Sequence, residues 1–119
     1  MRAFSPTPQV HHDTAIVWFL FRGVGTAGCT EPESPLQAMN GLTRHMIQAG
    51  KESEYHDHDD KEQLYYIISG HGKVKIDGKI HPIKAGDAVY LAPKVKHQVI
   101  NDSDDWIEHI LVDAKVPSD

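Results

Sequence analysis

The chain has 119 residues, of which 39% are hydrophobic and 24% charged, and its formal net charge is −5 with nine histidines counted as neutral. A chain of this length forms one domain with a single core. The negative balance and the scattered lysines and arginines argue against nucleic acid and against an anionic membrane surface as partners. We therefore expect a small-molecule ligand.

Cys29 is the only cysteine, so an internal disulfide is ruled out and the cytoplasm is the expected location. The longest apolar stretch is Ala15–Phe21. Its seven residues are too few for a membrane span, and its flanks differ from those of a secretory signal. We expect this stretch to be a core strand, without any contact with a membrane.

The N-terminal residues 1–13 contain Pro6, Pro8 and a pair of adjacent histidines, and we expect them to form a loosely ordered arm. Residues 14–119 are then the folded domain. After the strand at Ala15–Phe21, three glycines between 23 and 28 and the sequence E-P-E-S-P at 31–35 predict a surface loop.

Short apolar runs separated by turn signals fill the rest of the chain. The dipeptide Asp77-Gly78 predicts a two-residue type I′ hairpin. Strands at this regular spacing, without a helical period between them, predict an all-β domain, either an antiparallel sandwich or a barrel. The expected strands are Leu42–Ala49, Gln63–Ser69, Lys73–Ile76, Lys79–Lys84, Ala88–Leu91, His97–Ile100 and Trp106–Val112.

Two histidines precede one of these strands in the sequence E-Y-H-D-H-D-D-K-E-Q. Side chains two residues apart share a face only on extended backbone, so His56 and His58 can bind one ion only if the chain is extended there. The strand signal at Gln63–Ser69 favours that conformation. The alternative is a solvated turn, because acidic and basic residues surround both histidines.

The segment from Gly50 to Asn101 resembles the two sequence motifs of the cupin superfamily. The first motif is written G-x5-H-x-H-x3-4-E-x6-G and the second G-x5-P-x-G-x2-H-x3-N. Both frames are kept here without a gap. The first motif falls on Gly50, His56, His58, Gln63 and Gly70, and the second on Gly86, Ala92, Lys94, His97 and Asn101.

This resemblance implies a single-domain jelly-roll β-barrel that holds one divalent transition metal ion, whether iron, nickel, zinc, cobalt, copper or manganese. It implies that His56, His58 and His97 are ligands, with Gln63 in the position usually held by glutamate. Gln63 either coordinates the ion through a neutral oxygen or lines the cavity beside it. A glutamate would reduce the charge of the ion and its ligands to +1, whereas Gln63 leaves it at +2.

Three positions depart from the family pattern. Glu62 lies one residue before the glutamate position, so it is expected on the opposite face of the strand unless a bulge rotates it inward. Ala92 and Lys94 replace the usual proline and glycine. Because Pro93 lies between them, we expect a slightly altered turn that still positions His97.

Tyr65 has the same strand parity as Gln63 and is therefore expected to face the cavity. It is a candidate catalytic residue, a hydrogen-bond donor that could transfer a proton; the alternative is a buried core tyrosine. On the preceding strand either Arg44 and Met46 or His45 and Ile47 face inward. The remaining histidines of the barrel are expected at the surface or behind the ligands: His45, His71, His81 and His109.

The family implies several activities, and our leading hypothesis is a metal-dependent enzyme that acts on a small oxygenated anion by dioxygenation or by Lewis-acid lyase or isomerase chemistry. Alternatives are a non-catalytic module that binds a metabolite through its metal, and a scaffold whose site has decayed. A homodimer is also expected. Ala15–Phe21 is apolar at every position, with Trp18 and Phe19 on opposite faces, so one face can cover the barrel and the other can meet a second copy.

Overall fold

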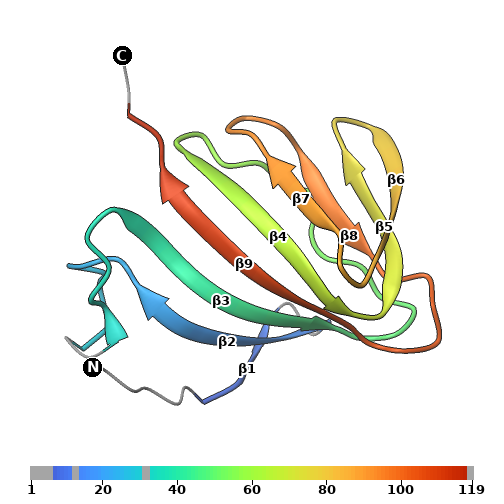
Figure 1. Ribbon diagram of the computed structural model, residues 1–119, viewed down its shortest axis with the longest axis horizontal. Helices are drawn as coiled ribbons and strands as arrows, with labels where there is room; N and C mark the ends of the chain where they lie inside the picture. Colours follow the sequence, from blue (N-terminus) through green and yellow to red (C-terminus); the bar gives the residue numbers. More distant parts are fainter. Residues whose placement is uncertain (1–6, 12–13, 31–32, 118–119) are drawn as a thin grey trace.

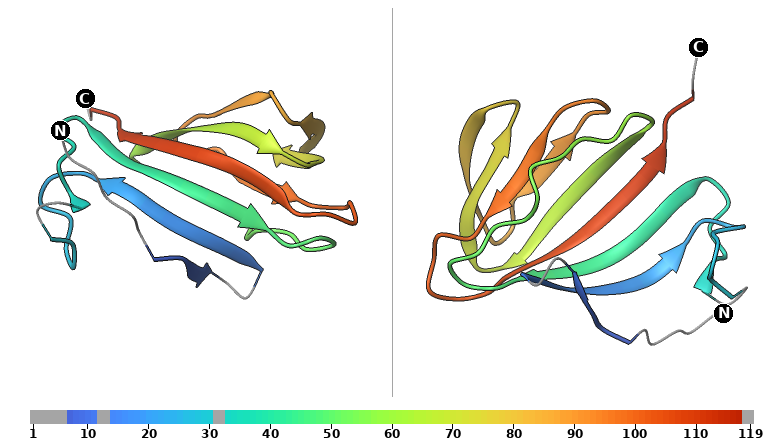
Figure 2. Two further views of the ribbon diagram at one scale, coloured as in Figure 1. Left: turned by 60° about the horizontal axis from the view of Figure 1, so that its bottom comes forward. Right: turned by 180° about the vertical axis from the view of Figure 1, so that it is seen from behind.

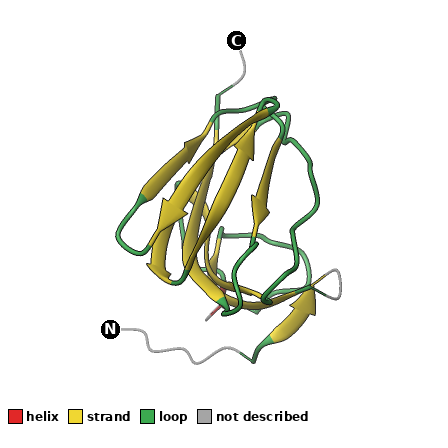
Figure 3. Ribbon diagram, turned by 90° about the vertical axis from the view of Figure 1, so that its right-hand side faces the viewer, coloured by secondary structure: helices red, strands yellow, loops and turns green. Residues whose placement is uncertain are grey.

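The computed structural model describes residues 7–11, 14–30 and 33–117, and most of this chain is strand (Figure 3). None of the helical turns in these ranges is long and apolar enough to cross a membrane. The strands are β1 (Gln9–His11), β2 (Ala15–Arg22), β3 (Met39–Ile47), β4 (Lys61–Ser69), β5 (His71–Ile76), β6 (Lys79–Lys84), β7 (Ala88–Leu91), β8 (His97–Ile100) and β9 (Ile107–Lys115).

The strands form two antiparallel sheets. The larger has the order β1-β2-β3-β9-β4-β7 and the smaller the order β6-β5-β8. In Figures 1 and 2, β5, β6 and β8 lie at one end of the molecule and β1, β2 and β3 at the other, with β4 and β9 between them. Strands that follow one another in the sequence are often not adjacent in a sheet. For example, β3 lies between β2 and β9, not beside β4. The all-β jelly-roll fold expected from the sequence is confirmed.

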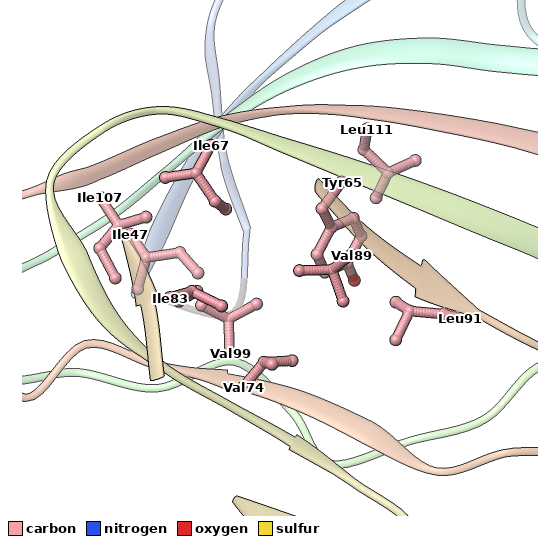
Figure 4. Packing of buried hydrophobic residues seen from close by; sticks show 10 residues of the cluster. All are labelled: Ile47, Tyr65, Ile67, Val74, Ile83, Val89, Leu91, Val99, Ile107 and Leu111. Atoms are coloured by element: carbon pink, nitrogen blue, oxygen red, sulfur yellow. The ribbon is translucent and has the colours of Figure 1, made fainter. Parts of the chain in front are cut away.

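The core lies between the two sheets and follows from the alternation of buried and more exposed residues along β4, β7, β8 and β9. In β4, Gln63, Tyr65 and Ile67 are buried while Leu64 and Tyr66 are exposed. Side chains from both sheets point toward one another in this core (Figure 4). Its members are Ile47, Tyr65, Ile67, Val74, Ile83, Val89, Leu91, Val99, Ile107 and Leu111. The expected inward parity of Gln63 and Tyr65 is therefore confirmed.

Two turns show why particular glycines are needed. Asp77 and Gly78 have φ values of 49° and 80°, which is the positive pair that a type I′ hairpin requires. Gly70, between β4 and β5, has a φ of +87°, and a Cβ placed there would collide with the carbonyl oxygen of Trp106. Gly70 therefore combines a left-handed backbone with a close approach of two chain segments.

Several strand ends differ from the sequence expectation by one to three residues: β2 continues to Arg22, β4 begins at Lys61 and β5 begins at His71. The strand expected at Leu42–Ala49 is Met39–Ile47, because the chain turns after Ile47 and the Lys51 N–H donates to the Gln48 carbonyl at 3.1 Å. The last strand begins one residue later than expected and continues to Lys115, because its end pairs with the start of β4. This extension places Asp113 opposite Gln63.

Within the segment expected as a loose arm, Gln9–His11 pairs with β2, and residues 1–6 and 12–13 lie outside the described residues. β2 thus has β1 on one edge and β3 on the other. Phe19 faces the barrel interior, where it lines a cavity. The Trp18 ring stacks against the Arg44 guanidinium instead, with 4.2 Å between the ring centroid and the Arg44 Cζ. The two aromatic side chains therefore lie on opposite faces of β2.

Candidate metal centre

Backbone hydrogen bonds join the loop before β4 to the start of β8. The His56 N–H donates to the His97 carbonyl at 3.1 Å, and the His97 N–H donates to the His56 carbonyl at 2.8 Å. The Lys94 N–H donates to the His58 carbonyl at 2.7 Å, from a turn in which Lys94 has a φ of 64°. Lys94 thus has a left-handed backbone at the position where the family pattern has glycine, and the turn that contains it leads into His97.

These bonds bring three imidazoles together. One ring nitrogen from each of His56, His58 and His97 lies within 4.8 Å of the other two. The Nε2 atoms of His56 and His58 are 3.1 Å apart. Two nitrogens bound at about 2.1 Å to one ion have about this separation, so the spacing fits a shared metal.

The opposite side of two rings is held by the backbone. The Nδ1–H of His56 donates to the Glu54 carbonyl at 2.8 Å, and the Nδ1–H of His97 donates to the Val95 carbonyl at 3.1 Å. Since a carbonyl can only accept, Nδ1 carries the proton in both rings and Nε2 keeps its lone pair. The His97 Nε2 is buried and has no hydrogen-bond partner among the described residues, so this donor set fits a divalent ion.

Burial favours the neutral, metal-binding form of His58 and His97. It lowers the pKa of His97 to about 4, with further lowering by the charges of His56 and His58. Burial also lowers the pKa of His58, and Lys61 lowers it further. A neutral imidazole is the form that coordinates a metal, so at neutral pH no proton has to be displaced from His97.

Gln63 projects from β4 into the same interior. It is buried, and its Oε1 has no hydrogen-bond partner among the residues that the structure describes. The side chain therefore offers a neutral oxygen toward the cavity. Glu62 lies on the outer face beside the exposed Tyr90, whose pKa is raised by partial desolvation and by Glu62. This position agrees with the expectation that Glu62 points to the face of β4 opposite to Gln63.

Tyr65 lies between the three histidines and the deeper part of the barrel. Its ring centroid is 6.3 Å from that of His97 and 4.7 Å from that of His109. Burial, assisted by Asp113, raises the pKa of the Tyr65 hydroxyl well above its ordinary value. The hydroxyl therefore stays protonated at neutral pH and can donate a hydrogen bond inside the barrel.

A cavity of about 390 Å³ is lined by His56, His58, Gln63 and Tyr65. Its wall also contains an ion pair between Lys61 and Asp113, whose Nζ and Oδ2 atoms are 3.2 Å apart. The sequence analysis did not select Asp113. The alternating pattern of β9, which places Ile107, His109, Leu111 and Asp113 on one face, is the signal that could have found it.

The cavity wall also settles which residues of β3 face inward, since His45 and Ile47 line it. His71 and His81 are exposed, as expected. His109 is 2% exposed and forms part of the cavity wall beside Tyr65, so of the two expected positions the surface is excluded. The structure therefore adds two imidazoles, those of His45 and His109, to the interior.

The family model described as a cupin domain matches residues 43–112, more than half of the chain. An uncharacterized protein of Methanocaldococcus jannaschii is 32% identical over 60 residues, which are 50% of this chain and 48% of that protein. An oxalate-binding protein of Thermotoga maritima is 30% identical over 71 residues, which are 60% of this chain and 59% of that protein. The chain thus matches about half or somewhat more of the length of these curated relatives.

The similarity in fold extends over nearly the whole chain. A crystal structure described as a predicted oxalate decarboxylase from Thermotoga maritima has a TM-score of 0.78 at 21% identity, covering 93% of this chain and 94% of that chain. Cupins commonly bind a metal, and here three histidines lie at the position where the family pattern has its ligands. From the matched domain and the shared fold, the chain belongs to the cupin family.

Proposed function

We propose that this cupin is a metal-dependent enzyme that acts on a small oxygenated anion. The observation that carries the proposal is the convergence of three imidazoles around a buried His97 Nε2 that lacks a partner in the described chain. Leaving such an atom unpaired costs about 1–3 kcal/mol. A divalent ion bound by His56, His58 and His97 would remove that cost.

Gln63 determines the charge of the proposed site. A bound divalent ion would polarise a substrate oxygen, and iron would in addition support dioxygenation. Gln63 contributes no negative charge to offset that ion, and Asp113 is already paired with Lys61 at 3.2 Å. The cavity therefore favours an anionic ligand over a neutral one, because an anion offsets a charge that is costly in a partly apolar enclosure.

Tyr65 is the proposed proton-transfer residue. Its buried hydroxyl keeps its proton at neutral pH, and its ring lies next to that of His97. A protonated hydroxyl in this position can donate to a substrate oxygen and stabilise negative charge that develops there. Lyase or isomerase chemistry would use this donor directly, whereas dioxygenation would use it to orient the substrate.

A second candidate function is binding of a metabolite through the metal, without turnover. One of the relatives is named an oxalate-binding protein, and that name favours this candidate. A crystal structure described as a predicted oxalate decarboxylase favours the enzyme instead. Both names suggest an oxalate-like dianion as the first ligand to be tested.

Binding and turnover can be separated in one experiment. Metal-loaded wild type is tested for oxalate binding by calorimetry and then assayed with a panel of keto acids, diketones and sugar derivatives, in air and without oxygen. His97→Ala is the site variant, and His81→Ala, an exposed histidine of β6, is the control. Turnover that needs metal and His97 supports an enzyme. Binding without turnover of any panel member supports the binding module.

We propose that the protein is a cytoplasmic homodimer, as the sequence predicts. Four large apolar side chains are exposed on the outer face of β4 and β7, namely Leu64, Tyr66, Ile68 and Tyr90. This surface is a candidate contact with a second copy, in addition to the outer face of β2 that the sequence suggests. Light scattering at micromolar concentration should give the mass of a dimer, and a monomer would contradict the proposal.

A further inference from the structure

His45 and His109 form a pair of imidazoles inside the cavity, separate from the candidate metal ligands. They are register partners on β3 and β9. Their rings stack in parallel, with centroids 5.0 Å apart and an angle of 4° between the planes. Both line the cavity that is also lined by His56 and His58, two of the three candidate metal ligands. The barrel interior therefore has two polar regions.

The pair is uncharged, and its unused hydrogen-bonding atom is on His109, whereas the Nδ1 of His45 lies 3.4 Å from the Thr43 Oγ1. Burial, and to a lesser extent His11, lowers the pKa of His45 to about 4. Burial, followed by the charge of His45, lowers the pKa of His109 to about 3. A neutral imidazole has one donor and one acceptor. The Nδ1 of His109 is buried and has no hydrogen-bond partner in the described part of the chain.

The ring of Tyr65 separates this pair from the metal centre. It lies 4.7 Å from the His109 ring and 6.3 Å from the His97 ring, measured between centroids. The cavity of about 390 Å³ is much larger than a two-carbon diacid needs, since each water in the liquid occupies only about 30 Å³. A ligand bound at the histidine trio thus has space to extend toward His45 and His109.

We infer that the His45–His109 pair is a second subsite, which binds an uncharged hydroxyl or carbonyl group of the ligand. A hydroxyl suits two neutral imidazoles because it can donate to one nitrogen and accept from another. The substrate class is then a hydroxylated carboxylic acid, with its oxyanion at the metal and a hydroxyl at the pair. This inference rests on the proposed anion site and extends it from a small dianion to a longer ligand.

The experiment compares ligands that differ only in the distal hydroxyl. Metal-loaded protein is titrated calorimetrically with 2-oxohexanoate and with its 4-, 5- and 6-hydroxy derivatives, which share one metal-binding head. The variants are His45→Phe and His109→Phe, which keep a ring and remove its nitrogens. His81→Phe, exposed on β6, is the control. Circular dichroism checks that each variant folds. Because His45 is half-buried and His109 is buried, His45→Phe should disturb the packing less than His109→Phe does.

We expect wild type to bind at least one hydroxy derivative about 3- to 10-fold more tightly than 2-oxohexanoate, the value of one net hydrogen bond. This ratio should fall to about one in His45→Phe and His109→Phe and stay unchanged in His81→Phe. A ratio near one in wild type, or a ratio retained in the folded site variants, would overturn the inference. The ratio compares ligands with the same metal-binding head, so it tests only the distal subsite. Failure of wild type to bind oxalate would instead contradict the proposed function.

Discussion

Gln63 and Asp113 face each other across β4 and β9, on the interior side of the barrel. An amide and a carboxylate thus stand side by side near the three histidines. The carboxylate of Asp113 forms an ion pair with Lys61 at 3.2 Å, so these two charges offset each other. The charge of an ion bound by neutral imidazoles and Gln63 would therefore remain uncompensated, which underlies the preference for an anionic ligand.

Replacing Gln63 with Glu should weaken the binding of anions. The new carboxylate lowers the charge of the ion and its ligands from +2 to +1, so oxalate binding should weaken by about tenfold or more while metal is held as well or better. The measurement is calorimetry of metal-loaded wild type and Gln63→Glu with oxalate and with a neutral diol. Equal oxalate affinity in the two proteins would show that Gln63 does not determine the charge of the site.

Replacing His97 with Ala should remove the metal. The variant loses one of three imidazoles, including the Nε2 that is buried without a partner in the described residues. We expect metal content after purification and dialysis to fall from one ion per chain to a small fraction of that. Elemental analysis measures it, with His81→Ala as the matched control. Full metal content in His97→Ala would refute this ligand set.

Acid should destabilise the fold through His45 and His109. Both are neutral in the folded chain, with pKa values lowered to about 4 and about 3, whereas an unfolded histidine titrates near about 6.5. Below that pH the unfolded chain binds protons that the folded chain does not. The free energy of unfolding should therefore fall as pH drops from about 6.5 toward about 4, by up to about 1.4 kcal/mol per pH unit for each histidine.

Urea unfolding at about pH 7, 6 and 5 measures this loss, and His45→Phe tests its origin. The variant removes one of the two buried histidines, so its stability should depend less steeply on pH than that of wild type. If the free energy of unfolding changes equally with pH in wild type and in His45→Phe, His45 does not cause the loss of stability in acid. Groups that do not interact with His45 contribute equally in both proteins and cancel in the comparison, whereas His109, whose pKa the charge of His45 lowers, does not.

Two glycines with similar backbone angles should differ in their tolerance of alanine. Gly70 and Gly78 have φ values of +87° and +80°, but only at Gly70 would a Cβ meet other atoms, those of Trp106 and Ile107. Gly78→Ala should lower the free energy of unfolding by about 1–2 kcal/mol, because alanine is less stable than glycine in a left-handed backbone. Gly70→Ala should cost at least about 2 kcal/mol more, because the turn must move. Thermal unfolding of both variants compares them, and equal losses would contradict this account.

The sequence predicted the parts of the site that depend on local spacing. The parity of Gln63 and Tyr65 follows from the two-residue period of extended chain, which the structure reproduces in β4. The i, i+2 histidines lie before β4, where His56 forms an isolated β-bridge with His97. The type I′ turn at Asp77-Gly78 follows from the backbone angles that this dipeptide favours. The resemblance to the cupin motifs supplied the partnership with His97, because no local rule joins residues forty positions apart.

The parts that were missed depend on register between distant strands. Whether His45 or Arg44 faces inward is decided by the pairing of β3 with β9, where His45 meets His109. Likewise, Asp113 reaches the cavity because β9 continues past Val112 to pair with the start of β4. A single strand does not reveal its partner or its register, and a shift of one residue would place these side chains outside.

The most direct test of the metal centre is anomalous diffraction from a crystal of the protein loaded with manganese, nickel or zinc and measured at the absorption edge of that metal. We expect one anomalous peak per chain, about 2.0–2.3 Å from the Nε2 atoms of His56, His58 and His97. Density for Gln63 Oε1 in the same shell would identify it as the fourth ligand. A fully loaded crystal with no peak between these histidines, or with its metal elsewhere, would contradict the account.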